Sequence, residues 1–327
     1  NHLMDIYVKK AIIHQFSPDD TDLYLADKFL NITPKIEEYL RKKIERVYSD
    51  EARTGIFEED NPFLEMISDD LLETSVAVAN RWKEEFVVSE NQKTNDLVFI
   101  QFSKEGVDHF AFLRIALRET LTHLGGEEDN PIKLTQNNLP GFGTGADEAL
   151  VINLQSRKYH LIEKRIKYNG AFLNYFSENL LQEQPKISPK KSITALEKTA
   201  QKIAESFNTD DFQFQSKVKS AIFNHIEEEK KLSPEKLADD LFDDNLTARL
   251  SFIDQVKEAV PEPVTFEEID ASRQLKKFEN QKLSLSNGIE LIVPNNVYED
   301  AESVEFILNE NGTYSILIKN IEDIQSK

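Results

Sequence analysis

The spacing of hydrophobic residues changes several times along this 327-residue chain and limits the folds that it can adopt. After a strand-like start at residues 6–16, apolar residues recur every three or four positions in 33–50 and 68–88, as in amphipathic helices. Strand-like runs follow in 96–166, and helical spacing returns in 169–259. Because helices and strands are grouped and do not alternate, we predict an α+β fold. It should contain an antiparallel β meander flanked by helices, a helical middle region and a C-terminal β-hairpin region.

Turn residues indicate where the strands pair. Two apolar runs surround residues 103–106, and a second pair surrounds residues 155–158. Near the end of the chain, Asn287-Gly288 and Asn311-Gly312 each lie between two apolar runs, and Asn-Gly is typical of tight hairpins. These four turns predict four antiparallel hairpins.

Capping residues mark the starts of the first two helices. Thr33 precedes Pro34, and proline is tolerated at the first position of a helix. Ser68 can cap the second helix, since Asp69 and Asp70 follow it and acidic side chains suit a helix N-terminus. We therefore expect these helices to begin after Thr33 and Ser68.

Proline-containing links divide the chain into three predicted parts. Residues 182–192 contain two prolines and several lysines and serines, which is typical of an exposed linker, and Pro261 begins a second boundary. Met4 is the expected native start, with the three preceding residues as an addition. The predicted parts are an N-terminal α+β domain with an antiparallel sheet (4–180), a helical region (181–262) and a C-terminal β-rich region (263–327).

The composition argues against several classes of enzyme and binding site. The chain has no cysteine, which excludes disulfides, thiolate catalysis and cysteine-ligated zinc. Its six histidines show no H-x-x-x-H spacing, and G-x-S-x-G is absent. No apolar run approaches the roughly 18 residues of a membrane helix. We predict a protein that is not an enzyme, with no cofactor, no metal site and no membrane association.

A glycine-rich segment, LPGFGTGADEAL (residues 139–150), resembles a phosphate-binding loop in composition. A dinucleotide fingerprint requires a buried strand before the glycines and a helix directly after them. Here polar residues and Pro140 precede the glycines, and a strand-like run follows. Asp147 and Glu148 would also repel a phosphate. Residues 141–146 are therefore predicted to form a loop between two strands, with no nucleotide.

Two further segments have both a functional and a structural interpretation. Residues 239–244 place aspartates one helical turn apart, as oxygen ligands for a divalent cation would be, but no EF-hand glycine or terminal glutamate follows. Residues 233–255 have the helix, short turn and helix pattern of a helix-turn-helix. A recognition helix should be basic, but here Arg249 and Lys257 are offset by Asp254 and Glu258. A solvated helix end and ordinary helix packing are the favoured interpretations.

One region opposes the overall net charge of −20. Residues 155–202 contain ten lysines and arginines against four acidic residues, with tyrosines interleaved. A basic stripe with aromatic residues is typical of nucleic-acid binding, whereas the alternative is a solvated face that attracts the protein's own acidic regions. The predicted nucleic-acid-binding residues, here called the basic stripe, are Arg157, Lys158, Lys164, Arg165, Lys167, Tyr168, Lys190 and Lys191.

The order of these segments resembles a family of bacterial nucleoid-associated proteins, the NdpA/YejK-like proteins. The resemblance is dispersed over nearly the whole chain. It depends on IIHQF in the first strand, on residues 44–57 (IERVYSDEARTGIF), on residues 147–165 (DEALVINLQSRKYHLIEKR) and on the two C-terminal hairpins. The resemblance implies a cytoplasmic protein that associates with the nucleoid and binds DNA without marked sequence preference. No catalytic or cofactor residues come with it.

Two hypotheses follow for the function. In the first, the basic stripe binds DNA directly. In the second, an acidic adaptor protein reaches the nucleoid through a protein partner, because a net charge of −20 opposes contact with phosphate backbones. We also predict a homodimer, since several hairpins leave sheet edges to cover and closed twofold pairs are the commonest solution.

Overall fold

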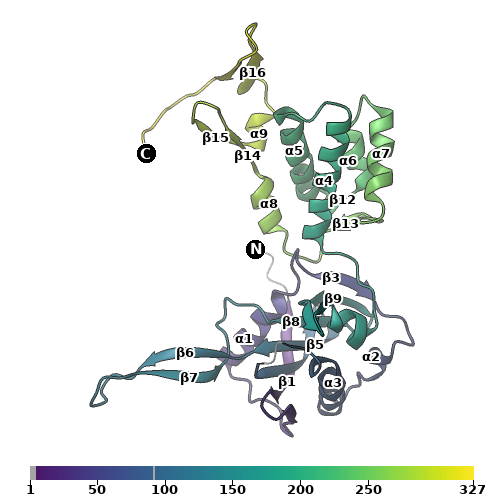
Figure 1. The fold of residues 1–327 in the computed structure, drawn as a ribbon, viewed down its shortest axis with the longest axis vertical. Coiled ribbons are helices and arrows are strands. Elements are labelled where there is room, and N and C mark those ends of the chain that lie inside the picture. Colours follow the sequence, from purple (N-terminus) through teal and green to yellow (C-terminus); the bar gives the residue numbers. More distant parts are fainter. Residues whose placement is uncertain (1–4, 91–92) are drawn as a thin grey trace. The chain divides into compact units, whose positions relative to one another are not determined.

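The computed structural model of the protein describes residues 5–90 and 93–327 (Figure 1). The expected native start, Met4, lies outside the described residues. Contacts within the chain divide it into two compact units, of which the first ends at Ser188 and the second begins at Pro189. The predicted domain boundaries at residues 180/181 and 262/263 stay predictions. The α+β class is confirmed by a large antiparallel sheet, helices and C-terminal β-hairpins.

A seven-stranded sheet in the order β2-β1-β4-β5-β8-β9-β3 forms the centre of the first unit. Every neighbouring pair in it is antiparallel, as predicted for the meander. The long central hairpin joins β4 to β5 through residues 105–106, and the chain turns between β8 and β9 at 154–157. The strands are β1 (Ile6–Ser17), β2 (Asp22–Tyr24), β3 (Arg53–Ile56), β4 (Asn95–Lys104), β5 (Val107–Ala116), β8 (Glu148–Asn153) and β9 (Lys158–Ile162).

Both faces of this sheet are buried, by different helices. Leu97 and Phe99 of β4 face a core that includes Trp82 of α3 (Leu71–Phe86), whereas Val98 and Ile100 face a second core. That second core includes side chains from α1 (Pro34–Glu45). Alternate residues of β4 therefore enter opposite cores, which explains why its apolar run is nearly continuous although the sheet is antiparallel.

The helix caps agree in part with the sequence predictions. Thr33 caps α1, and its side chain accepts a hydrogen bond from the Ile36 N–H. The predicted cap at Ser68 is wrong, because α3 begins at Leu71 and the Asp70 carboxylate accepts from the Glu73 N–H. Asp70 lies one position before the helix, where its side chain can reach the third amide and also suits the helix dipole.

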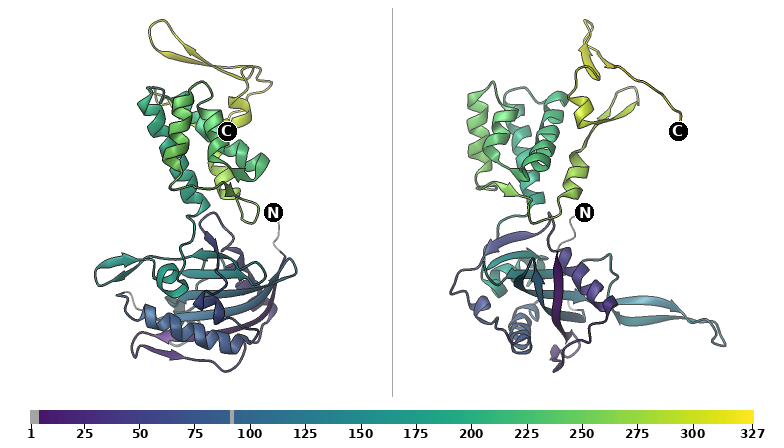
Figure 2. Two further views of the ribbon diagram at one scale, coloured as in Figure 1. Left: turned by 90° about the vertical axis from the view of Figure 1, so that its right-hand side faces the viewer. Right: turned by 180° about the vertical axis from the view of Figure 1, so that it is seen from behind.

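A two-stranded arm separates β5 from β8 and was not predicted. It is made of β6 (Arg118–His123) and β7 (Ile132–Asn138), which pair only with each other within the described residues. In Figure 1 and Figure 2 the arm extends away from the seven-stranded sheet. The glycine-rich segment follows the arm and leads into β8, so the predicted loop between strands is confirmed.

The end of the first unit departs from the predicted helix at residues 169–181. A small hairpin is made by β10 (Ile166–Tyr168) and β11 (Ala171–Leu173), and a π-helix, η1 (Phe176–Leu181), follows. Asn169 and Gly170 both have positive φ, which allows the tight turn that ends the helical pattern. A short helix, α2 (Pro62–Glu65), completes the helices of this unit.

The second unit begins with four helices, in the part of the chain where the sequence shows helical spacing up to residue 259. In this unit α4 packs on α7, and α6 packs on both α5 and α7. The segment that resembles a helix-turn-helix in sequence is therefore a pair of helices packed on each other. Arg249 of α7 lies 3.4 Å from the Asp239 carboxylate of α6. The helices are α4 (Pro189–Ser206), α5 (Phe212–Glu229), α6 (Pro234–Leu241) and α7 (Leu246–Val256), with a small ladder of β12 (Lys231–Leu232) and β13 (Val264–Thr265).

The C-terminal hairpins form where Asn-Gly pairs predict them. Asn287-Gly288 lies between β14 (Asn280–Ser284) and β15 (Glu290–Pro294). Asn311-Gly312 lies between β16 (Val304–Leu308) and β17 (Tyr314–Ile318). Both glycines have positive φ, which such turns require. Two short helices that were not predicted accompany them, α8 (Ser272–Phe278) and α9 (Asn295–Tyr298).

Candidate nucleic-acid interface

The glycine-rich loop is held by basic side chains of α1. The Lys43 ammonium donates to the carbonyls of Gly141, at 2.7 Å, and Thr144, and Arg46 donates to the carbonyl of Gly143. Lys43 is fully buried, and its ammonium lies 4.4 Å from the centre of the Tyr39 ring. The loop therefore presents carbonyl oxygens to the protein's own cations, which is the reverse of a loop whose N–H groups cradle a phosphate.

The electrostatic environment of Lys43 is positive. Burial, together with the nearby Arg46 and Arg118, lowers the pKa of Lys43 to about 8. Arg118 lies at the foot of the arm, so its positive field reaches the buried face of α1. The loop, α1 and the arm thus share one electrostatic neighbourhood in the first unit.

The first two residues of the basic stripe lie at the turn into β9. Arg157 has a positive φ of 64°, and its guanidinium is 3.7 Å from the carboxylate of Glu59. Its carbonyl accepts from the Phe57 N–H, so the Arg157 backbone also fixes the neighbouring segment. Lys158 follows as the first residue of β9 and is partly exposed.

The central part of the stripe runs from the link after β9 into β10. Lys164 and Lys167 are exposed, and their ammonium groups are 2.8 Å from Asp147 and 3.3 Å from Glu90. Arg165 is also exposed and donates a long hydrogen bond, 3.4 Å, to the carbonyl of Phe172. Three cations within four positions therefore reach solvent, although two of them have acidic partners.

Tyr168, the aromatic member of the basic stripe, is the last residue of β10. Its ring packs 6.3 Å from the ring of Tyr175, and its hydroxyl donates to the carbonyl of Glu85. Burial raises the pKa of Tyr168, with further contributions from Glu85 and Glu148. Tyr168 thus anchors β10 to the core beneath the exposed cations.

Lys190 and Lys191 are exposed in the first turn of α4. The prediction that residues 182–192 form an exposed linker is therefore wrong for this part: Pro189 begins the helix, and Ser188 and Ser192 are buried. Proline suits a first helical position, which explains why a proline-rich pattern can start a helix. These two lysines belong to the second unit, separate from the other members of the stripe.

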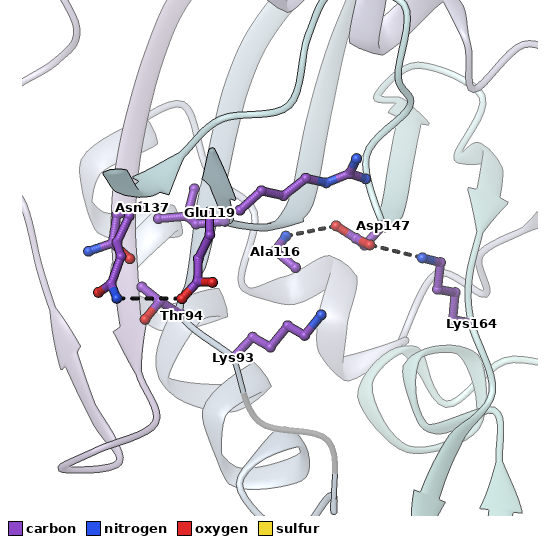
Figure 3. A pocket seen from close by; sticks show the side chains of 10 residues that line it. Lys93, Thr94, Ala116, Glu119, Asn137, Asp147 and Lys164 are labelled. Atoms are coloured by element: carbon purple, nitrogen blue, oxygen red, sulfur yellow. Dashed lines mark hydrogen bonds and ion pairs between the residues drawn. The ribbon is translucent and has the colours of Figure 1, made fainter. Parts of the chain in front are cut away.

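A polar pocket of about 740 Å³ adjoins Lys164 at the foot of the arm (Figure 3). Lys164 Nζ bonds Asp147 Oδ1, and the Ala116 N–H donates to Asp147 Oδ2 at 2.7 Å. Burial opposes the ionised form of Asp147, but these two hydrogen bonds hold its pKa below the ordinary value. The pocket is lined by Lys93, Thr94, Ala116, Leu117, Arg118, Glu119, Gln136, Asn137, Asp147 and Lys164.

A buried polar network lies next to Asp147. The Arg114 guanidinium donates to Glu148 at 2.6 Å and to the Asn95 amide oxygen at 3.0 Å. Tyr175 donates to the same Glu148 carboxylate, and burial and Glu148 raise the pKa of this tyrosine. Glu148 also accepts from the Lys164 N–H at 3.3 Å. The network therefore fixes the backbone at both ends of the Asp147–Lys164 pair.

Lys93 and Arg118 are the basic residues that the sequence interpretation missed. They lie far from the stripe in the chain, so a count of charges along the sequence cannot find them. In the structure they line the same pocket as Lys164. The basic edge of the first unit thus extends from Arg165 and Lys167, through Lys164, to the foot of the arm.

Comparison with known families supports the resemblance seen in the sequence. The family described as nucleoid-associated protein YejK matches residues 12–324. The chain belongs to this family. The predicted association with the bacterial nucleoid, and with it a cytoplasmic location, is thereby confirmed, and the family is a nucleoid-associated one and not a family of enzymes. No curated protein matches the chain.

None of the helices in the described part of this YejK-family chain combines the length and apolar character that crossing a membrane requires. The acidic segment 239–244 forms pairs with basic side chains. Asp240 pairs with His225, and Asp243 lies 3.7 Å from Lys217. Three of its four carboxylates, those of Asp239, Asp240 and Asp243, therefore lie beside basic side chains of the second unit.

Proposed function

We propose that this YejK-family protein binds duplex DNA directly and without marked sequence preference. The observation that supports this most is the concentration of exposed positive charge at one edge of the first unit in a chain of net charge −20. Lys164, Arg165 and Lys167 form the centre of the surface, and Lys93 and Arg118 continue it. Phosphate contacts position a protein on DNA but do not read its sequence, so low sequence preference is expected.

The acidic partners of the stripe do not prevent this role. The pair between Lys167 and Glu90 is 46% exposed on both sides, and exposed ion pairs contribute only about 0–1 kcal/mol to stability. Lys164 keeps more than half of its side chain exposed beside the more buried Asp147. A DNA phosphate can therefore replace Glu90 at Lys167 at little cost. Arg157, Lys158 and Tyr168 remain proposed members of this surface, and Lys190 and Lys191 remain proposed DNA contacts of the second unit.

A salt series tests this proposal. With direct contact, the logarithm of the association constant should fall linearly with the logarithm of salt concentration, with a slope of about −0.9 per neutralised phosphate. Changing Lys164, Arg165 and Lys167 together to Glu should weaken binding to unrelated duplexes by similar factors and flatten the slope. Fluorescence anisotropy with two labelled duplexes of different sequence measures both quantities.

A matched variant separates the local effect from that of total charge. Changing Lys276, Lys277 and Lys282 to Glu alters the net charge equally, but these exposed residues lie outside the stripe. It should bind DNA more tightly than the stripe variant. If wild type binds no duplex even at low salt, direct binding is wrong. Retention on a nucleoid extract that is then lost after protease treatment would support the adaptor hypothesis.

We also propose that the protein is a homodimer and that the arm contributes to it. On one face of the arm Leu121 pairs with Leu134, and His123 pairs with Ile132. The three apolar side chains are 70%, 54% and 67% exposed. An isolated two-stranded hairpin is marginally stable in water, so such a face is expected to be covered. A second copy would cover two identical faces at once.

The proposed function includes no catalytic step. The family description supports this, and so does the engagement of the buried titratable groups near the pocket. Arg114 and Tyr175 both donate hydrogen bonds to Glu148, and a buried network of this kind stabilises the fold. We assign these residues a structural role and no proton transfer.

A further inference from the structure

The pocket at the foot of the arm contains two cations without an acidic partner. Its two carboxylates are already engaged: Asp147 by Lys164 and the Ala116 N–H, and Glu119 by the Gln136 amide at 3.4 Å. Within residues 5–90 and 93–327, neither Lys93 nor Arg118 forms an ion pair with a carboxylate.

The two cations converge on one space. Lys93 precedes β4, and Arg118 begins β6, yet both line the pocket with Lys164. In Figure 3 the Lys93 side chain extends between Glu119 and the Asp147–Lys164 pair. Like charges that face one solvent-filled space repel each other, so an anion in that space would be favoured.

The backbone of β7 is irregular next to the pocket. The pairing of β6 and β7 shifts between Arg118 and Thr120, so that two residues of β7, Gln136 and Asn137, lie opposite Glu119 alone, as in a β-bulge. Asn137 has a φ of 60°, in the left-handed region that favours glycine. Bulges redirect side chains and occur next to functional sites. Both bulged residues, with Arg118 and Glu119 opposite them, line the pocket.

The remaining lining suits a small, strongly polar ligand. Thr94, Gln136 and Asn137 add a hydroxyl and two amides that can donate hydrogen bonds. An arginine fork matches the oxygens of a phosphate, which can accept two parallel bonds from a guanidinium, and a lysine in the same pocket adds a second positive charge. The volume, about 740 Å³, admits a phosphate together with the sugar attached to it.

We propose that this pocket binds a phosphate group, with Arg118 and Lys93 as its charged contacts and Lys164 as the link to the basic stripe. In its DNA form the inference rests on the proposed function, since one backbone phosphate would enter the pocket while neighbouring phosphates lie along Lys164 and Lys167. A free phosphate or nucleotide has the same chemistry and is the second possible source.

The test uses the full chain and three variants. Arg118→Gln and Lys93→Gln each remove one charge from the pocket. Lys133→Gln is the matched control, because it removes one charge from the same arm at a residue paired with Glu127, 3.5 Å away, outside the pocket. Thermal unfolding is measured for all three to show that they are folded.

Two titrations distinguish the sources of the phosphate. In the first, a labelled duplex is titrated across salt: each pocket variant should lose several-fold in affinity and reduce the salt slope by about 0.9, whereas Lys133→Gln changes both less. In the second, inorganic phosphate and a nucleoside monophosphate are titrated by calorimetry, and binding should be lost in the pocket variants.

Every outcome decides the inference. A specific loss in the duplex titration assigns the pocket to the DNA backbone, and a loss only in the second titration assigns it to a free phosphate. If wild type binds free phosphate but no duplex, the proposed DNA-binding function fails while the pocket stands. If both pocket variants match Lys133→Gln in both titrations, the pocket inference is overturned, even when wild type binds DNA.

Discussion

Buried polar side chains determine much of the first unit at the scale of single residues. His14, on β1, is fully buried: its Nδ1 accepts from the Ala26 N–H at 3.0 Å, and its Nε2 lies 2.8 Å from the Ser75 hydroxyl. Because Nδ1 is an acceptor, the proton must be on Nε2, and the ring is neutral. The sequence showed His14 within a strand but gave no sign of these partners, since Ala26 and Ser75 are distant in the chain.

The neutral His14 predicts a pH dependence of stability. Burial lowers the pKa of His14 from its ordinary value of 6.5, so below about pH 6.5 the unfolded chain binds a proton that the folded one resists. The free energy of unfolding should therefore fall as pH falls from about 6.5. Urea unfolding at about pH 7.5 and about pH 5.5 measures this loss, by at most about 1.4 kcal/mol per pH unit.

A His14→Asn variant keeps a short acceptor but cannot be protonated in this range. It should be less stable at neutral pH and should lose part of the acid sensitivity. His123→Asn is the control, because His123 is exposed on the arm, where its Nε2 bonds the Asn130 side chain. Equal acid sensitivity in wild type and His14→Asn would show that His14 does not titrate as described.

At the scale of elements, the sequence predicted the helices and hairpins that a capping or turn residue marks. It did not predict the arm, whose strands pair only with each other within the described residues. Thr33-Pro34 and the Asn-Gly turns act through their own backbone, so α1 and the C-terminal hairpins appear where the sequence places them. The arm has polar, threonine-rich strands, and one of them, residues 132–138, resembles a loop in composition. Its strands exist because they pair with each other, which is information that a single strand does not carry.

Gly55 of β3 gives a prediction at this scale. It faces Tyr159 of β9 in the register of the two strands, and a β-carbon at Gly55 would overlap the buried Tyr159 ring. Gly55→Ala should therefore lower the free energy of unfolding by about 1–3 kcal/mol through overpacking. Chemical denaturation measures the change, with Gly141→Ala as control.

The control also tests the glycine-rich loop. Gly141 has no heavy atom within 4 Å of an added β-carbon and does not adopt positive φ, so alanine should change stability by less than about 0.5 kcal/mol. A large loss at Gly141 would show that the loop requires its glycines. Equal effects at Gly55 and Gly141 would contradict the close approach of Tyr159 to β3.

At the scale of the whole molecule, the fold class followed from the sequence but the basic surface followed only in part. Helical and strand-like periods are local, and their order was enough for α+β. The charge count found Lys164, Arg165 and Lys167 because they are neighbours in the chain. Lys93 and Arg118 join them through the packing of β4, the arm and the turn after β9, and no sequence spacing encodes that meeting.

The apolar face of the arm carries the prediction about assembly. In a dimer closed by the arms, four leucines would leave water, and each buried leucine contributes about 1.5–3 kcal/mol. Changing Leu121 and Leu134 together to Ser should therefore weaken dimerisation by about 100-fold or more. Light scattering at micromolar concentration should give twice the 37.7 kDa chain mass for wild type and a value near one chain for the variant.

The opposite face of the same arm provides the control. Thr122 and Thr135 lie there, with their hydroxyls 3.4 Å apart, so changing both to Ser alters the arm without touching the leucines. This variant should remain a dimer. A single-chain mass for wild type would refute the dimer. A dimer that survives the loss of both leucines would place its interface elsewhere, and the exposed face of the arm would then need a different partner.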